Sequence, residues 1–136
     1  MDVARADSTV ATLLSSDTIV VWPDTPVSEV AALLDASGAS GIPVVDWSGY
    51  LVGVVSQLDI VRVRASDNLL VDWSRLCARH VMSQAWLTVA IDTALEDAAR
   101  LVASLNVHRL VVVEDDGESP IGVLSATDLL GAIAGR

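Results

Sequence analysis

The amino-acid sequence predicts an α/β protein made of two similar halves, and three observations lead to that fold class. Residues 53–60 (GVVSQLDI) recur as residues 122–129 (GVLSATDL), 69 positions later in a chain of 136 residues. Short β-branched runs alternate with segments that repeat apolar residues at the i, i+3, i+4, i+7 spacing of a helix. The candidate strands are almost continuously apolar, which is typical of strands covered on both faces. Because an internal repeat fixes the architecture, each half should form a β-α-β-β-α unit.

The repeat extends over nearly the whole chain. Residues 24–27 align with 92–95, and residues 42–46 align with 110–114, both 68 positions later. The one extra residue falls in the acidic turn 115–119, where an insertion is tolerated. We therefore predict a first repeat over residues 9–65, a linker over 66–76 and a second repeat over 77–134. Since about 60 residues form only a marginal core, the repeats should pack on each other about a pseudo-two-fold axis.

Each repeat is expected to open with a strand and a helix. The runs 19–21 and 87–89 are predicted strands. Thr25 is the predicted N-cap of the next helix, with Pro26 at its first position, and Thr93 is expected to form a capping box with Glu96. Gly38 and Asn106 are suited to the left-handed conformation that ends a helix. The apolar stripes between these signals consist of Val27, Val30, Ala31 and Leu34, and of Leu95, Ala98, Ala99 and Val102.

The second part of each repeat is expected to be a hairpin followed by a helix. Residues 42–45 and 51–55 flank the turn 47–49, and residues 110–113 and 121–124 flank the acidic turn. A second helix should begin after Ser56 and after Ser125. Residues 75–82 are expected to form a short lead-in helix for the second repeat.

The composition argues against several classes of partner and compartment. The net charge is −10, and all eight cationic side chains are arginines, so nucleic acid and anionic lipid are not expected partners. The single cysteine, Cys77, excludes a disulfide within the chain and fits a reducing compartment. No apolar run approaches the ~18 residues of a membrane span, and no apolar stretch of a signal peptide follows the first residues. We expect a soluble, cytoplasmic protein.

The two closing motifs, residues 53–59 and 122–128, together with residues 42–46 and their partners, resemble the CBS domain, the repeat named after cystathionine β-synthase. The resemblance covers essentially the whole chain and implies a stand-alone CBS pair, or Bateman module. It implies a regulatory module without a catalytic domain. The sequence itself contains no Ser/His/Asp or Cys/His set for nucleophilic catalysis, no glycine-rich phosphate-binding loop and no cysteines and histidines at the spacing of a zinc site. We therefore expect no enzyme and no metal site.

The Ser-x-x-Asp motif at each strand-to-helix junction has two interpretations. In the first, Ser56 and Ser125 cap a helix, and Asp59 and Asp128 lie at its positive end. The second adds a ligand, because a carboxylate at this turn can accept hydrogen bonds from ribose hydroxyls. The family resemblance implies that second role, and we expect it more strongly at Asp128 than at Asp59.

The turn before each middle strand is the second candidate. The resemblance implies that backbone groups of this turn contact an adenine and that its apolar side chains sandwich the ring. This transfers to Gly41, Ile42 and Pro43 in the first repeat and to Arg109, Leu110 and Val111 in the second. The alternative is that the Ile42 and Leu110 side chains are simply core. Where the first repeat has the family's usual proline, the second has Val111.

Residues 107–113 are similar to a segment of the gamma subunits of AMP-activated protein kinase. That similarity implies that His108 and Arg109 lie near nucleotide phosphates, and a guanidinium can hold phosphate through its planar fork. Arg79 and His80 belong to the second repeat by sequence and could serve the same end. They could equally pair with surface carboxylates.

Together these features predict a regulatory sensor that binds an adenosine-containing ligand, such as AMP, ADP or ATP, in clefts between the repeats. The nucleotide would be a regulatory ligand and not a catalytic cofactor. The alternative is a ligand-free module for dimerisation or partner docking. A homodimer is expected, because apolar residues on the last helix of each repeat exceed what a small core can cover; they are Ile60, Val61, Val63, Leu129, Leu130, Ile133 and Ala134. An effector protein outside this chain would read the change.

Overall fold

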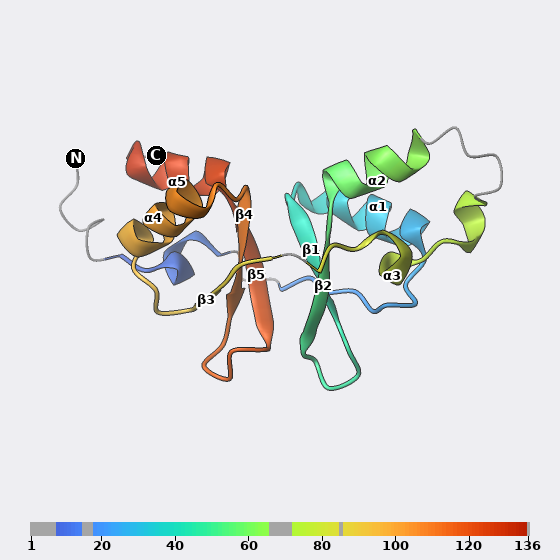
Figure 1. The fold of residues 1–136 in the computed structure, drawn as a ribbon, viewed down its shortest axis with the longest axis horizontal. Coiled ribbons are helices and arrows are strands. Elements are labelled where there is room, and N and C mark those ends of the chain that lie inside the picture. Colours follow the sequence, from blue (N-terminus) through green and yellow to red (C-terminus); the bar gives the residue numbers. More distant parts are fainter. Residues whose placement is uncertain (1–7, 15–17, 66–71, 85, 136) are drawn as a thin grey trace. The chain divides into compact units, whose positions relative to one another are not determined.

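The chain folds into two compact units in a computed structural model that describes residues 8–14, 18–65, 72–84 and 86–135 (Figure 1). Unit 1 comprises Met1–Thr18 and Trp86–Arg136, and unit 2 is Ile19–Ala85. The α/β class is confirmed, since each unit combines helices with a small sheet. The units divide the chain at different points from the predicted repeats, because the segment that leads into each repeat packs in the unit of the other repeat.

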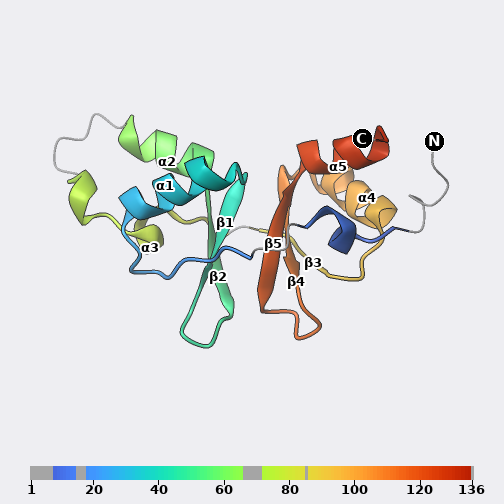
Figure 2. The same cartoon turned by 180° about the vertical axis from the view of Figure 1, so that it is seen from behind.

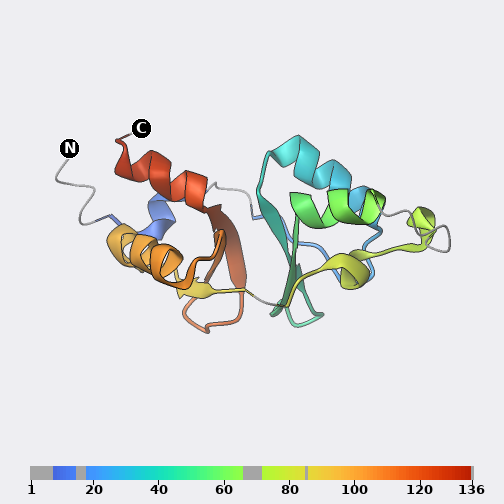
Figure 3. The same cartoon turned by 45° about the horizontal axis from the view of Figure 1, so that its top comes forward.

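Unit 2 packs helices α1 (Val27–Ser37) and α2 (Gln57–Arg64) beside the antiparallel hairpin of β1 (Gly41–Val45) and β2 (Leu51–Ser56) (Figure 3). The 3-10 helix η3 (Trp73–Arg75) and the short helix α3 (Ala78–Val81) complete it. The predicted apolar stripe of α1 faces the core, except that Ala31 is only partly buried. The core consists of Val21, Val27, Val30, Leu34, Ile42, Val44, Val55, Ile60 and Ala78.

Unit 1 repeats this arrangement around a three-stranded sheet. Strand β3 (Thr88–Ala90) runs parallel to β4 (Arg109–Val113), which pairs antiparallel with β5 (Pro120–Ser125). Helices α4 (Leu95–Leu105) and α5 (Ala126–Ile133) lie side by side against it, together with the 3-10 helix η2 (Val10–Leu13) (Figures 1 and 3). The core consists of Val10, Val89, Leu95, Ala98, Leu110, Val112, Leu124, Leu129 and Ala132.

The lead-in segment of each repeat packs on the hairpin and helices of the other repeat (Figure 2). The segment 8–14 belongs to unit 1, where the Val10 N–H donates to the Thr93 carbonyl at 2.8 Å. The helix α3 within the predicted segment 75–82 belongs to unit 2, where the Ala78 N–H donates to the Thr25 carbonyl at 2.8 Å. The predicted lead-in helix therefore exists, but it packs against the first repeat.

This exchange also explains why both predicted threonine N-caps were wrong. Helix α1 follows Pro26 and helix α4 follows Ala94, and neither cap residue makes a side-chain cap. The first helical N–H groups instead donate to lead-in carbonyls, Val27 to Leu76 at 3.0 Å and Leu95 to Ser8 at 2.9 Å. Because the orphan donors of the helix ends are satisfied by a distant segment, no threonine cap is needed.

Other local predictions had mixed outcomes. The helix stops were confirmed, since Gly38 and Asn106 have φ of 69° and 53°. The predicted strand 19–21 is reduced to an isolated bridge between Val21 and Val44. The extended segment ends at Val21 because the chain then turns, and the Trp22 N–H donates to the Thr25 hydroxyl at 2.9 Å.

A glycine in the second hairpin strand of each unit, Gly53 in β2 and Gly122 in β5, leaves the space that a side chain of the lead-in segment fills. A methyl group on Gly53 would lie 2.4 Å from Met82 Sδ, 2.8 Å from its Cγ and 3.1 Å from its Cβ. On Gly122 it would lie 2.5 Å from Leu14 Cδ2, and the next nearest atom is 3.6 Å away. The Gly53 site is therefore crowded along the whole Met82 stem, whereas at Gly122 only the end of a flexible side chain must move.

We expect Gly53→Ala to destabilise the protein more than Gly122→Ala. Overpacking of a well-packed core costs about 1–3 kcal/mol, and Gly53→Ala should fall in that range while Gly122→Ala falls at or below its lower end. Urea denaturation followed by circular dichroism measures both. The double variant Gly53→Ala/Met82→Ala should recover part of the loss, and equal costs for the two single variants would contradict the packing argument.

Candidate functional site

The strongest candidate site is built twice, once in each unit, at the junction between the second hairpin strand and its following helix. In unit 2, the Ser56 N–H and hydroxyl donate to Asp59 Oδ2 at 2.8 and 2.9 Å, and the Asp59 N–H donates to Ser56 Oγ at 3.2 Å. Ser125 and Asp128 make the same three contacts in unit 1, at 2.7, 3.0 and 3.1 Å. The predicted capping role of both motifs is confirmed.

This capping geometry determines what each motif can still offer to a ligand. Among the described residues, all contacts to the two carboxylates end on Oδ2, so Oδ1 of Asp59 and of Asp128 can accept further hydrogen bonds. Each serine hydroxyl already donates its proton to the aspartate, so towards a ligand it can act only as an acceptor. Ser56 is buried and Asp59 partly buried, whereas Asp128 is exposed.

The residues predicted to form the adenine turns are the first residues of β1 and β4, and they lie directly beside these junctions. Gly41 pairs with Ser56 across the β1–β2 ladder, and the Gln57 N–H donates to the Ser40 carbonyl. In unit 1, Arg109 pairs with Ser125. The Ala126 N–H donates to the His108 carbonyl at 3.0 Å. The structure thus brings each predicted turn next to the carboxylate of its own repeat.

Both turns carry a buried polar atom that has no partner in the part of the chain that the structure describes. These atoms are Ser40 Oγ in unit 2 and Arg109 Nε in unit 1. A buried donor or acceptor without a hydrogen bond costs free energy, so such atoms are rare in folded proteins unless water or a ligand satisfies them. Sequence reasoning did not select Ser40. The signal was available, because Ser40 aligns with His108 at the repeat offset of 68.

The apolar side chains of these turns serve the core, as the alternative interpretation held. Ile42 and Leu110 are 1% and 0% exposed, and each belongs to the core cluster of its unit. Any contact of these two residues with a ligand would therefore involve backbone groups. His108 is exposed and Arg109 partly buried.

Arg79 and His80 both lie in α3, which belongs to unit 2. They belong to the second repeat by sequence, as expected, but the structure packs them with the hairpin and helices of the first repeat. Arg79 forms an ion pair with Asp24, and His80 Nδ1 accepts from the Cys77 N–H at 3.0 Å. Cys77 is buried. His108 and Arg109 remain the candidate phosphate contacts of the unit 1 turn.

The acidic turn of the second hairpin is an internally bonded loop. Asp116 accepts hydrogen bonds from the side chain of Ser119 and from the backbone N–H groups of Glu118 and Ser119, and these bonds hold the pKa of Asp116 below its usual value. Within the described ranges, no group of three or more His, Cys, Asp or Glu side chains is arranged to hold a metal ion.

Comparison with known proteins identifies the family. The model of the CBS domain matches this chain twice, over residues 10–66 and 78–135. The chain belongs to the CBS domain family. The CBS pair is similar to CBSX2, a chloroplastic CBS-domain protein of Arabidopsis thaliana, at 33% identity over 83% of this chain and 57% of the relative. It is 34% identical to MJ1232 of Methanocaldococcus jannaschii over 85% of this chain and 37% of that protein.

Solved CBS structures share the fold over nearly the entire chain. A crystal structure of CBSX2 in complex with AMP superposes with a TM-score of 0.72 at 32% identity, covering 93% of this chain and 96% of that one. The CBS domain of a membrane protein from Sphaerobacter thermophilus superposes with a TM-score of 0.79 at 28% identity, covering 95% and 90%. The chain spans 85% of the relative MJ1426 but 37% and 57% of MJ1232 and CBSX2, and only a quarter of MJ1404. Among the described residues, no helix is long and apolar enough to cross a membrane.

Proposed function

We propose that this CBS pair is a regulatory sensor that binds an adenosine-containing ligand at the two Ser-x-x-Asp junctions. The observation that carries the proposal is a pair of buried polar atoms, Ser40 Oγ and Arg109 Nε, which have no hydrogen-bond partner among the described residues. They lie beside the capping boxes of Asp59 and Asp128. The two atoms lie at neighbouring positions of the repeat alignment, since Ser40 aligns with His108 and Gly41 with Arg109. The relative CBSX2, at 32% identity, has been crystallised in complex with AMP, which supports an adenine nucleotide as the ligand.

The chemistry assigns a role to each element of the junction. The free Oδ1 of Asp128, or of Asp59, accepts hydrogen bonds from ribose hydroxyls. Backbone groups of residues 109–110, or 41–42, contact the adenine while the Leu110 and Ile42 side chains stay in the core. Arg109 supplies a cationic group and His108 a ring N–H donor for phosphate, and unit 2 has Ser40 and Gly41 at the aligned positions. Ser125 and Ser56 hold the aspartates in place and offer a hydroxyl acceptor to the ligand.

These differences predict unequal sites. The Asp128 site combines an exposed carboxylate with the guanidinium of Arg109 and the imidazole of His108, and should bind the nucleotide more tightly than the Asp59 site. Binding would regulate an effector protein by changing how the repeats or subunits pack, which a ligand can do only through unequal affinity for the two states. The proposed module carries out no catalysis itself.

Asp128→Asn should weaken AMP binding by roughly tenfold to a hundredfold, because a hydrogen bond to a charged acceptor contributes about 1.5–3 kcal/mol. Asparagine keeps a carbonyl oxygen for the Ser125 cap but replaces the second oxygen by a donor, so the fold should persist. Isothermal titration calorimetry measures the affinity. Asp59→Asn is the matched variant in unit 2, and it should have the smaller effect.

A thermal-shift screen should precede calorimetry, with AMP, ADP, ATP, S-adenosylmethionine, NAD and cyclic dinucleotides as the probes. If none of them binds the wild-type chain, the sensor proposal is wrong and the module is one for dimerisation or partner docking. If AMP binds with equal strength to the wild type, Asp128→Asn and Asp59→Asn, the junctions are not the site.

A further inference from the structure

Gln57, the first residue of helix α2, contacts the turn before β1 with its side chain as well as with its backbone. Its side-chain amide Nε2 donates to the Ala39 carbonyl at 3.0 Å, and its backbone N–H donates to the Ser40 carbonyl at 3.4 Å. One residue therefore occupies two neighbouring carbonyls of this turn. Because Gln57 is exposed, the contact between its amide and the turn lies at the surface of the Asp59 junction.

The aligned residue of unit 1 leaves one of these two carbonyls open. Ala126 stands 69 positions after Gln57, and its backbone N–H donates to the His108 carbonyl at 3.0 Å. The alanine side chain has no donor, and within the described residues nothing donates to the carbonyl of Val107, which aligns with Ala39. The Val107 carbonyl can therefore accept a hydrogen bond from a ligand. At Ala39, a ligand must displace the Gln57 amide or share the oxygen with it.

We propose that Gln57 is a specificity-determining residue, which weakens adenine binding at the Asp59 junction by occupying the carbonyl that would accept the exocyclic amine of the base. The inference rests on the proposed function, since it concerns the difference between two sites for the same ligand. Adenine carries an amine donor where hypoxanthine, the base of inosine monophosphate, carries a carbonyl oxygen. An open backbone carbonyl therefore selects adenine, because the other base would leave that acceptor unpaired. A carbonyl covered by an amide loses this preference.

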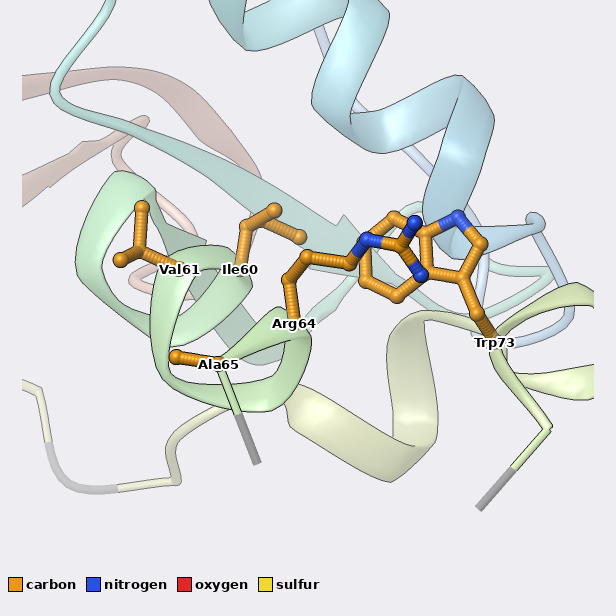
Figure 4. Close-up of a pocket in the computed structure, with 5 residues that line it drawn as sticks. All are labelled: Ile60, Val61, Arg64, Ala65 and Trp73. Atoms are coloured by element: carbon orange, nitrogen blue, oxygen red, sulfur yellow. The ribbon is translucent and has the colours of Figure 1, made fainter. Parts of the chain in front are cut away.

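Removing the Gln57 amide should leave the rest of α2 in place, because other contacts hold both ends of the helix. At its first turn, the capping box of Ser56 and Asp59 remains. At its last turn, the Arg64 guanidinium lies across the indole of Trp73, with 5.2 Å between the guanidinium carbon and the ring centroid (Figure 4). The indole N–H signal of Trp73 therefore reports whether α2 keeps its position when Gln57 is replaced.

The test is an AMP titration of the isotope-labelled full chain, followed by amide signals that report each junction separately: Gly41 and Asp59 for unit 2, Arg109 and Asp128 for unit 1. Gln57→Met removes the amide donor and keeps a side chain of similar length. It should raise the AMP affinity of the unit 2 junction about fivefold, the equivalent of one net hydrogen bond of about 1 kcal/mol. Inosine monophosphate should gain nothing from the same change, because its base has an acceptor in place of the amine.

The reverse substitution tests the aligned carbonyl in unit 1. Ala126→Gln should lower the AMP affinity of the unit 1 junction about fivefold, by placing an amide donor on the Val107 carbonyl. Ala126→Met adds similar bulk without a donor and should leave the affinity within about twofold. Equal losses in the two Ala126 variants would mean that bulk is responsible and not the amide, and the proposal would be wrong.

The remaining outcomes separate this inference from the sensor proposal. If AMP shifts the signals of the Asp128 junction, but Gln57→Met changes no affinity or raises those for AMP and inosine monophosphate equally, this inference is wrong and the sensor proposal stands. If AMP shifts no signal of either junction in the wild-type chain or in Gln57→Met, both are wrong. A Trp73 indole signal that moves in ligand-free Gln57→Met would assign the effect to a displacement of α2 and would also overturn the inference.

Discussion

Leu110→Ala should lower the free energy of unfolding by about 2–5 kcal/mol, the range for truncating a fully buried leucine. Leu110 is 0% exposed and belongs to the core of unit 1, together with Val10, Leu124 and Leu129. The remaining cavity adds to the lost transfer energy, because a close-packed core relaxes only partly. Urea denaturation with circular dichroism as the signal gives the value.

Leu105→Ala is the matched control for this prediction. Leu105 is a leucine of the same unit at the end of α4, but it is 54% exposed, so its truncation should change stability by no more than about 0.5 kcal/mol. Ile42→Ala should behave as Leu110→Ala does, since Ile42 holds the equivalent place in unit 2. A Leu110→Ala variant with wild-type stability and impaired nucleotide binding would mean that the side chain contacts the ligand and does not serve the core.

Local sequence signals predicted those parts of the fold whose partners lie close in the chain. The helices that begin at Gln57 and Ala126 were predicted because the serine and aspartate that cap them are three residues apart. The left-handed stops at Gly38 and Asn106 depend on a single residue each. The hairpins were predicted because a turn joins adjacent apolar runs.

The features that sequence reasoning missed depend on contacts between distant segments. Leu14 and Met82 are 68 positions apart, which is the repeat offset, but nothing in the sequence pattern shows that Leu14 packs over Gly122 and Met82 over Gly53. That exchange moved Arg79 and His80 into unit 2. It also made the threonine caps unnecessary.

In the candidate site, too, the features set by local sequence could be predicted, and those set by distant contacts could not. The proximity of Asp128 to Arg109, and of Asp59 to Gly41, follows from the strand register that the hairpins impose. The unpartnered atoms of Ser40 and Arg109 could not be predicted, because hydrogen-bond satisfaction depends on every neighbour at once. Ser40 would have been a candidate if every polar residue aligned with His108 and Arg109 had been considered, and not only charged residues.

The predicted dimer face is now divided between core and surface. Leu129 and Ile60 are 3% and 9% exposed, so these two belong to the cores and the expectation that they form an interface was wrong. Leu130 and Ile133 on α5 are 57% and 59% exposed, and Val61, at the position equivalent to Leu130, is 60% exposed. Exposed apolar residues clustered on helices of both units are typical of an interface, so the homodimer stays a prediction with a smaller set of residues.

Ile133→Asp should therefore dissociate the homodimer without unfolding the chain. In a two-fold interface the charge enters twice, and if each copy costs about 2 kcal/mol, the value typical of an interface hot spot, the dissociation constant rises roughly a thousandfold. Light scattering gives the mass, and circular dichroism of the same samples reports the fold. Leu105→Asp places the same charge on an equally exposed helix position outside the predicted face and should leave the mass unchanged. A wild-type chain that is monomeric at tens of micromolar would contradict the prediction, because a dissociation constant of 1 μM needs only about 8 kcal/mol of binding free energy. An Ile133→Asp chain that keeps the wild-type mass would contradict it as well.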